Sequence, residues 1–234
     1  MEAPVESFGK NFRALVIGAS GGIGQALAAT LQRHDACRSV IGLSRSTDGL
    51  DLLDEDSIAA HAAKLADQQF NLIVCATGAL TINGVGPEKS IKQVTIDAMA
   101  AQFAINAIGP ALILKHFTPL LSASKRSVFA LLSARVGSIG DNRLGGWMSY
   151  RSSKAALNQI IRTAAIEIAR KRPEAVVVAI HPGTVNTTLS RPFALNHKST
   201  EPHEAASMIL TTVDGLRASD TGGFFAYDAR PIEW

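Results

Sequence analysis

A tyrosine and a lysine stand four residues apart in Tyr150-Arg-Ser-Ser-Lys154, at the start of a stretch with helical periodicity over residues 155–170. Positions i and i+4 share one face of a helix, so the phenol and the ammonium can converge on one point. A nearby cation favours the ionised form of a phenol, which makes the pair a candidate proton donor and acceptor. Without other signals, such a pair is more often a packed ring beside a solvated charge.

The composition fits one α/β domain spanning residues 1–234. Hydrophobic residues make up 47% of the chain and charged residues 18%, which favours a large core over disorder. No run approaches the length that crosses a bilayer, and the first residues are too polar for a secretory signal, so we expect a cytoplasmic protein. The net charge of +3 comes without a basic stripe, which argues against nucleic acid.

Cysteines and histidines give no sign of a metal site. Cys37 and Cys75 lack metal-ligand or CxxC spacing, and both are expected to be reduced, buried thiols. His181, His197 and His203 are interpreted as ordinary loop or helix-cap residues, because no ligand spacing connects them.

A glycine-rich segment follows the first apolar run. Residues 13–17 lead into Gly18-Ala-Ser-Gly-Gly-Ile-Gly24, and an amphipathic helix continues to about Arg33. Glycines allow a tight turn and let a diphosphate approach a helix N-terminus, where free N–H groups favour anions. The spacing Gly-x-x-x-Gly-x-Gly differs from the usual dinucleotide fingerprint. The alternative is a flexible loop.

The second strand, residues 39–44, ends at Ser44 and Arg45. In a dinucleotide fold, an acid at this point would bind the ribose 2′-hydroxyl, whereas an arginine suits a 2′-phosphate. The sequence therefore predicts NADP(H) in preference to NAD(H). A solvated arginine in a loop is the alternative.

Apolar runs alternate with helical stretches along the rest of the chain, which predicts a parallel sheet covered on both faces. We expect a Rossmann-like, doubly wound, three-layer fold with ligands at the carboxyl ends of the strands. The seven predicted strands cover residues 13–17, 39–44, 51–54, 71–78, 126–132, 175–180 and 223–227, and the later helices 57–66, 96–121, 150–170 and 203–216.

Pro110 lies inside the long helix predicted over residues 96–121 and should loosen it, because proline removes an amide donor and clashes one turn back. Asn106 stands one turn earlier, where its side chain could serve the freed carbonyl or a water. A structural asparagine is the default interpretation.

Taken in order, these pieces resemble the short-chain dehydrogenase/reductase family over essentially the whole chain. The resemblance is carried by Gly18-x-x-x-Gly22-x-Gly24, Asn106, a serine after the fifth strand, Tyr150-x-x-x-Lys154 and Pro182-Gly183. The segments 133–139 and 150–154 look most like the branch of C-signal-type proteins and sniffer-type carbonyl reductases.

The resemblance implies a catalytic set of Asn106, Ser133, Tyr150 and Lys154. Tyr150 would be the acid/base, Lys154 would hold the nicotinamide ribose, and Asn106 would keep a proton-relaying water. Thr184 or Thr187 would hold the carboxamide. The full set expected to contact the cofactor is Gly18, Ser20, Gly21, Gly22, Ile23, Gly24, Ser44, Arg45, Asp51, Leu52, Ala76, Gly78, Asn106, Tyr150, Lys154, Pro182, Gly183, Thr184, Val185 and Thr187.

Two departures from the family pattern concern function. The family commonly has Asn-Asn-Ala-Gly after the fourth strand, where this chain has Cys75-Ala-Thr-Gly78. The second of two usual serines after the fifth strand is Ala134. Either Ser133 or Ser138 then holds the substrate oxygen, or Tyr150 acts alone; we favour Ser133, although a one-residue register shift would reverse its facing.

Two functions are therefore predicted. The first is an NADP-dependent carbonyl reductase or alcohol dehydrogenase, whose substrate would be an apolar carbonyl compound because Trp147, Met148 and Phe193 lie in the expected pocket loops. The second is an NADP(H)-binding signalling or interaction protein with little turnover, which Ala134 and Cys75 mildly favour. The apolar long helices favour a homodimer or homotetramer.

Overall fold

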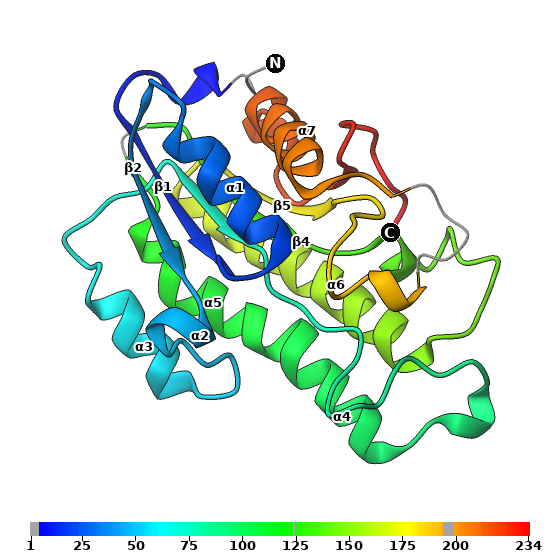
Figure 1. Cartoon of the computed structure of the whole chain (residues 1–234). Helices are drawn as coiled ribbons and strands as arrows, with labels where there is room; N and C mark the ends of the chain where they lie inside the picture. The colour runs from blue at the N-terminus through cyan, green and yellow to red at the C-terminus, as the bar shows by residue number, and fades with distance from the viewer. Residues whose placement is uncertain (1–4, 124, 194–198) are drawn as a thin grey trace.

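A six-stranded parallel sheet in the order β2-β1-β3-β4-β5-β6 forms the centre of the computed structural model, which describes residues 5–123, 125–193 and 199–234 (Figure 1). Every neighbouring pair of strands is parallel. The strands are β1 (Phe12–Ile17), β2 (Cys37–Leu43), β3 (Leu72–Cys75), β4 (Ser127–Leu132), β5 (Ala175–His181) and β6 (Phe224–Ala226). The predicted fold class is confirmed.

Helices cover both faces of the sheet (Figure 1). One apolar cluster packs α1 and α7 on one face, and a second packs α3, α5 and α6 on the other. The helices are α1 (Gly22–Gln32), α2 (Arg45–Asp48), α3 (Glu55–Ala63), α4 (Ile96–Phe103), α5 (Gly109–Phe117), α6 (Met148–Lys171) and α7 (Pro202–Gly215). β2 lies on one side of β1, and β3 lies on the other side. The strand order therefore reverses at β1, and a ligand crevice forms at the carboxyl ends of the strands at such a reversal.

The predicted strand at residues 51–54 is wrong: this segment is a turn between α2 and α3. Its two aspartates bond to nearby backbone amides, because Asp51 accepts from the N–H of Leu53 at 2.9 Å and Asp54 from that of Asp56 at 3.0 Å. Such local bonds compete with a strand ladder, and Asp54 instead caps α3. The sheet therefore has six strands within the described residues.

The long helix predicted over residues 96–121 is interrupted by a turn of π-helix at Ala104–Ile108, directly before Pro110. This is the expected loosening, since a π turn accommodates a residue that cannot donate to the ladder. Contrary to expectation, the span Ile96–Leu120 is long and apolar enough to cross a membrane by length and composition alone. Within this span, α4 packs against α6 and α5 packs against α3 and α6.

Candidate active site

The turn after β1 depends on two of its glycines. Gly18 has a φ of +90°, and a Cβ there would lie 2.8 Å from the carbonyl oxygen of Ala76 at the end of β3. A Cβ on Gly24 would collide with the Gly18 carbonyl. These contacts close the turn onto the first residues of α1 and hold it against the neighbouring strand, so a side chain at either position would displace the backbone.

The N-terminus of α1 is open to an anion. Its N-cap is Gly21 in an extended conformation, and no side chain caps the helix. The first N–H groups of a helix lack partners within it, and together with the helix dipole they favour a negative charge. This observation fits the diphosphate of a dinucleotide, which Ser20, Gly21 and Gly22 would face.

A cavity of about 260 Å³ lies beside this turn at the carboxyl ends of β1, β2 and β3. Nine of the predicted cofactor residues line it, which are Gly18, Ser20, Gly21, Ser44, Arg45, Asp51, Leu52, Ala76 and Gly78. Ile23 does not: it packs against the apolar cluster under α1. The cavity thus gathers the residues expected around the adenosine half of the cofactor.

The short helix α2, directly after β2, carries an acid that the sequence interpretation missed. The Asp48 carboxylate accepts the N–H of Ser44 at 2.9 Å, and the Ser44 hydroxyl lies 2.6 Å from Thr47 Oγ1. Ser44 is buried, and its side chain is the N-cap of α2. Arg45 next to it is exposed, and its guanidinium has no hydrogen bond or ion pair within the described part of the chain.

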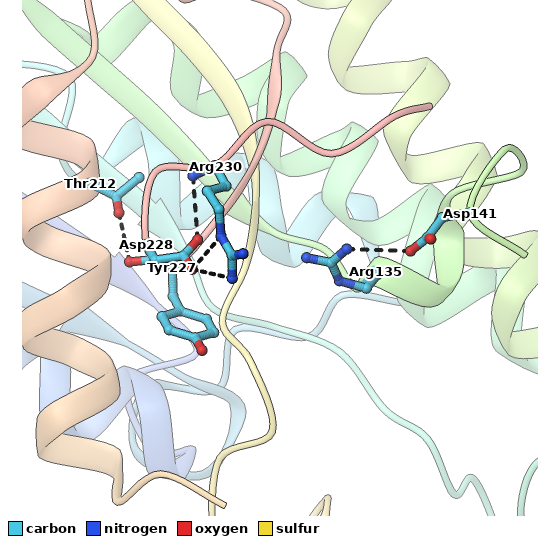
Figure 2. A network of polar contacts seen from close by, with 6 residues as sticks. All are labelled: Arg135, Asp141, Thr212, Tyr227, Asp228 and Arg230. Carbon is cyan, nitrogen blue, oxygen red and sulfur yellow. Dashed lines mark hydrogen bonds and ion pairs between the residues drawn. The ribbon is translucent and has the colours of Figure 1, made fainter.

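The segment Pro182–Thr187 follows β5 and lies outside this cavity. Gly183 has a φ of +80° and lies under the ring of Tyr227, to which a Cβ at Gly183 would come within 2.8 Å. Thr212 of α7 donates to the backbone carbonyl of Tyr227 at 2.7 Å, which holds the backbone that carries this ring (Figure 2). The methyl group of Thr187 reaches Gly22, so the segment borders the glycine turn from the other side.

Two other residues of this segment have structural partners. The carbonyl of Thr184 accepts from the N–H of Thr200 at 2.9 Å, and Val185 is buried and forms a bridge to Thr200. Figure 2 also shows the ion pairs Arg230–Asp228 and Arg135–Asp141 at this edge of the sheet.

Asn106, Lys154 and Gly78 meet at the end of β3. A Cβ on Gly78 would lie 3.1 Å from Asn106 Oδ1 and 3.3 Å from Lys154 Nζ. The Asn106 side chain accepts the N–H of Ala79 at 2.9 Å and donates to the Ala79 carbonyl at 2.8 Å. It also donates to Gln102 Oε1 at 2.6 Å. Asn106 therefore holds the turn after β3 and does not serve a carbonyl freed by Pro110.

Tyr150 and Lys154 are both buried on the first two turns of α6. Burial raises the pKa of Tyr150 to about 12 and lowers the pKa of Lys154 to about 8, since a low-dielectric site disfavours each charged form. Lys154 Nζ donates to the Leu132 carbonyl at 3.0 Å. Burial alone accounts for the shift of the phenol pKa, and the expected lowering by the Lys154 ammonium is not found in this structure.

The two candidate serines differ in their hydrogen bonds. Ser133 Oγ donates to Asn158 Oδ1 at 2.6 Å, on the α6 side of the sheet, while the Asn158 amide nitrogen has no partner within the described residues. Ser138 Oγ accepts the N–H of Asp141 at 3.0 Å, which leaves its own proton available. Both serines are buried.

Glu88 is a buried carboxylate that the sequence interpretation also missed. It comes from the loop between β3 and α4, and it accepts hydrogen bonds from both the backbone N–H and the hydroxyl of Ser149, next to Tyr150. Trp147 lies edge-on to Tyr150 with 6.2 Å between ring centroids, and to Phe193 with 5.5 Å. No local spacing could connect these segments.

The described residues contain no group of three or more histidine, cysteine or acidic side chains placed to hold a metal ion. Burial and the nearby Arg135 lower the pKa of His181 to about 4, and His197 lies outside the described residues. Cys75 is a buried free thiol as expected, but Cys37 is only partly buried.

Comparisons with known proteins identify the family of the chain. The family model described as short chain dehydrogenase matches residues 13–198. A 1-hydroxy-2-glutathionyl-2-methyl-3-butene dehydrogenase from Rhodococcus sp. (strain AD45) is 29% identical, over 94% of this chain and 98% of that protein. The C-signal of Myxococcus xanthus is 34% identical over 58% of this chain and 78% of its own length.

Solved structures share the fold. The NADPH-bound carbonyl reductase from chicken fatty liver superposes with a TM-score of 0.83 at 23% identity, covering 100% of this chain and 96% of that one. The Sniffer carbonyl reductase of D. melanogaster has a TM-score of 0.81 at 21% identity, covering 96% and 100%.

The matched region contains the glycine turn, Asn106, Tyr150 and Lys154, which are the residues that the structure places along the carboxyl edge of the sheet. The chain belongs to the short-chain dehydrogenase/reductase family of NAD(P)-dependent oxidoreductases.

Proposed function

We propose that this protein is an NADP(H)-dependent oxidoreductase that moves hydride between the nicotinamide and a carbonyl or alcohol carbon. The observation that carries the proposal is the convergence of Asn106 Oδ1 and Lys154 Nζ on Gly78, at the rim of the cavity beside the glycine turn. Tyr150 stands one helical turn before Lys154 on the same helix. The experiment is turnover of a carbonyl panel with NADPH, compared with NADPH binding followed by its fluorescence.

The residues have separate roles in this proposal. The N-terminus of α1 and the cavity would hold the diphosphate and adenosine, and the segment Pro182–Thr187 would hold the nicotinamide side. The bound nicotinamide supplies or accepts the hydride. Tyr150 would donate its proton to the carbonyl oxygen, Lys154 would contact the ribose hydroxyls, and Asn106 would fix the turn at Gly78 that lies between them.

Arg45 is proposed to select NADP(H), because it is exposed at the cavity rim with no partner in the described part of the chain. Replacing Arg45 with alanine should weaken NADPH binding about 10- to 100-fold, the expected loss for a charged hydrogen-bond pair, and change NADH binding little. Fluorescence titration with both cofactors measures this. Arg38→Ala, an exposed arginine at the start of β2, is the control; equal weakening of NADPH and NADH would refute the assignment.

The substrate oxygen needs a second donor, and the hydrogen bonds favour Ser138 over the Ser133 expected from sequence. Ser133 would have to release Asn158, whereas Ser138 has its proton available. Ser138→Ala should then lower kcat by about 10- to 100-fold, which is at or below the loss typical of removing one oxyanion-hole donor. Ser133→Ala should mainly lower stability. Steady-state kinetics beside urea unfolding would separate them, and the reverse pattern would restore Ser133.

An apolar carbonyl compound is the proposed substrate class, because Trp147 packs edge-to-face on the Tyr150 ring and Phe193 packs edge-to-face on Trp147. Aromatic rings beside a reactive group favour an apolar, flat partner. The name of the Rhodococcus relative suggests a second panel of glutathionyl alcohols. Preference for glutathionyl over aryl compounds would overturn the apolar assignment.

A signalling or interaction role with little turnover is the alternative, favoured by Ala134 in place of the usual serine and by the C-signal relative. It predicts NADPH binding, negligible turnover over both panels and a phenotype that survives Tyr150→Phe.

We also propose a cytoplasmic homodimer or homotetramer formed through α5 and α6, whose shared groove of about 530 Å³ includes Leu114, Ile160 and Ala164. Sedimentation of the wild type and an Ala164→Glu variant tests the assembly.

A further inference from the structure

The helix that carries Tyr150 begins without a cap of its own. Its N-cap residue is Trp147, which has a φ of 53° and a ψ of 40° and provides no side-chain hydrogen bond to the first turn. A left-handed conformation is uncommon for a bulky residue and persists only where the surroundings hold it. Something outside the helix must therefore fix its first turn.

Glu88 provides that support from 61 residues away in the sequence. One carboxylate oxygen accepts the N–H of Ser149 at 3.1 Å, and the other accepts the Ser149 hydroxyl. The backbone carbonyl of Glu88 also accepts the N–H of Trp147 at 2.6 Å. Glu88 is 6% exposed as a residue, so these bonds are shielded from bulk solvent, and each is stronger than at the surface.

The Glu88 carboxylate is held in its charged form. Burial is the largest single influence and raises its pKa, but the hydrogen bonds from Ser149 and from the backbone of Glu88 together lower the pKa, and the net shift is downward. A negative charge at a helix N-terminus is also favoured by the helix dipole. The carboxylate thus replaces the missing cap and stays ionised at neutral pH.

The same loop reaches the aromatic side of the site. Phe193 Cζ lies 3.7 Å from the Cβ position of Gly86, two residues before Glu88, and the Phe193 ring packs on Trp147. Trp147 in turn packs on Tyr150. The position of the phenol ring therefore depends on its packing against Trp147, and the hydrogen bonds between Glu88 and Ser149 hold this part of the helix in place.

We infer that Glu88 is a positioning residue for the reaction: by holding Ser149 and Trp147, it sets the phenol of Tyr150 at the place where a substrate oxygen receives its proton. This inference rests on the proposed oxidoreductase function. A displacement of a reacting group by about 1 Å can cost on the order of 100-fold in rate. Cofactor binding, which uses the glycine turn and the cavity, should be unaffected by Glu88.

The kinetic test compares Glu88→Gln with Glu204→Gln, an exposed carboxylate in the first turn of α7. Glutamine retains one acceptor oxygen but presents an N–H₂ group to the second donor. We expect kcat with NADPH to fall by about 10- to 100-fold in Glu88→Gln, with the Kd for NADPH unchanged within about twofold. The control should match the wild type in both values.

A double-variant cycle locates the effect. If Glu88 acts through Ser149, Ser149→Ala should lower kcat by a smaller factor, and adding it to Glu88→Gln should cost little more, because the shared contact is already lost. If the kcat losses of the two single variants multiplied in the double variant, the inference would be overturned. Ser149→Ala also keeps the test open if a Glu88 variant fails to fold.

A readout independent of turnover comes from tryptophan fluorescence. The chain has two tryptophans, so in a Trp234→Phe background the emission reports Trp147 alone. Glu88→Gln should shift this emission, and Glu204→Gln should not. An active wild type with unchanged kcat and emission in Glu88→Gln would overturn this inference alone, whereas a wild type that binds NADPH without any turnover would overturn the proposed function and the inference together.

Discussion

Replacing Tyr150 with phenylalanine should reduce carbonyl turnover by about 10²- to 10⁴-fold, the usual contribution of a positioned general acid. The change removes one oxygen from a residue that is 9% exposed and keeps the ring, which packs on Trp147. The raised pKa of about 12 keeps the phenol protonated at neutral pH, as a proton donor in the reducing direction requires. NADPH binding should persist, because the glycine turn and the cavity do not use the hydroxyl.

The only other tyrosine in the chain is the matched control for this change. Tyr227→Phe keeps the ring that covers Gly183 and the backbone carbonyl that Thr212 binds, so its turnover should stay near that of the wild type. Steady-state kinetics with NADPH fluorescence measures both variants. Tyr150→Phe with wild-type kcat would show that the phenol is not the proton donor, and the alternative signalling role would gain support.

The sequence predicted the sheet where the chain is continuously apolar, and it failed where short polar groups compete locally. β3 and β4 are fully buried runs of four and six residues, the pattern and length typical of strands inside a sheet covered on both faces. Residues 51–54 contain two leucines of strand-like character, but Asp51 and Asp54 satisfy backbone amides within two residues. The outcome depends on hydrogen bonds that hydrophobic patterning does not describe.

Nine of the predicted cofactor residues line one cavity at the carboxyl edge because parallel strands end together there, which follows from topology. What sequence could not provide is the direction of single side chains. Ser133 faces Asn158 because it continues the alternation of Phe129 and Leu131, so its facing depends on one residue of register. Glu88 meets Ser149 through the path of a loop, and no periodicity connects positions so far apart.

Lys154 presents a conflict between stability and function that a single substitution should expose. The residue is 3% exposed, and its ammonium donates to one carbonyl, that of Leu132. Burial lowers its pKa from 10.5 to about 8. Below pH 8 both the folded and unfolded chains carry the proton, and the folded state bears the full cost of burying the charge, on the order of 3 kcal/mol. Between about pH 8 and 10.5 the unfolded state binds more protons, so stability rises with pH.

Lys154→Met should therefore raise the free energy of unfolding at neutral pH by about 2 kcal/mol, the charge-burial cost less the lost hydrogen bond. The gain should shrink as the pH rises through the window above 8. Urea unfolding of both proteins at about pH 7 and about pH 10 measures this difference. Lys171→Met, at the exposed end of the same helix, should change stability by less than about 0.5 kcal/mol at either pH.

The same variant should lose carbonyl reduction, because no cation remains beside Gly78 to contact the cofactor ribose. In the wild type, kcat/KM for reduction, which reports groups of the free enzyme, should fall as the pH rises above about 8 and the ammonium loses its proton. The phenol, with a pKa of about 12, stays protonated throughout this range and cannot cause the fall. A destabilised Lys154→Met, or a kcat/KM that is flat across pH 8, would mean that the buried amine does not carry the charge on which the proposed mechanism depends.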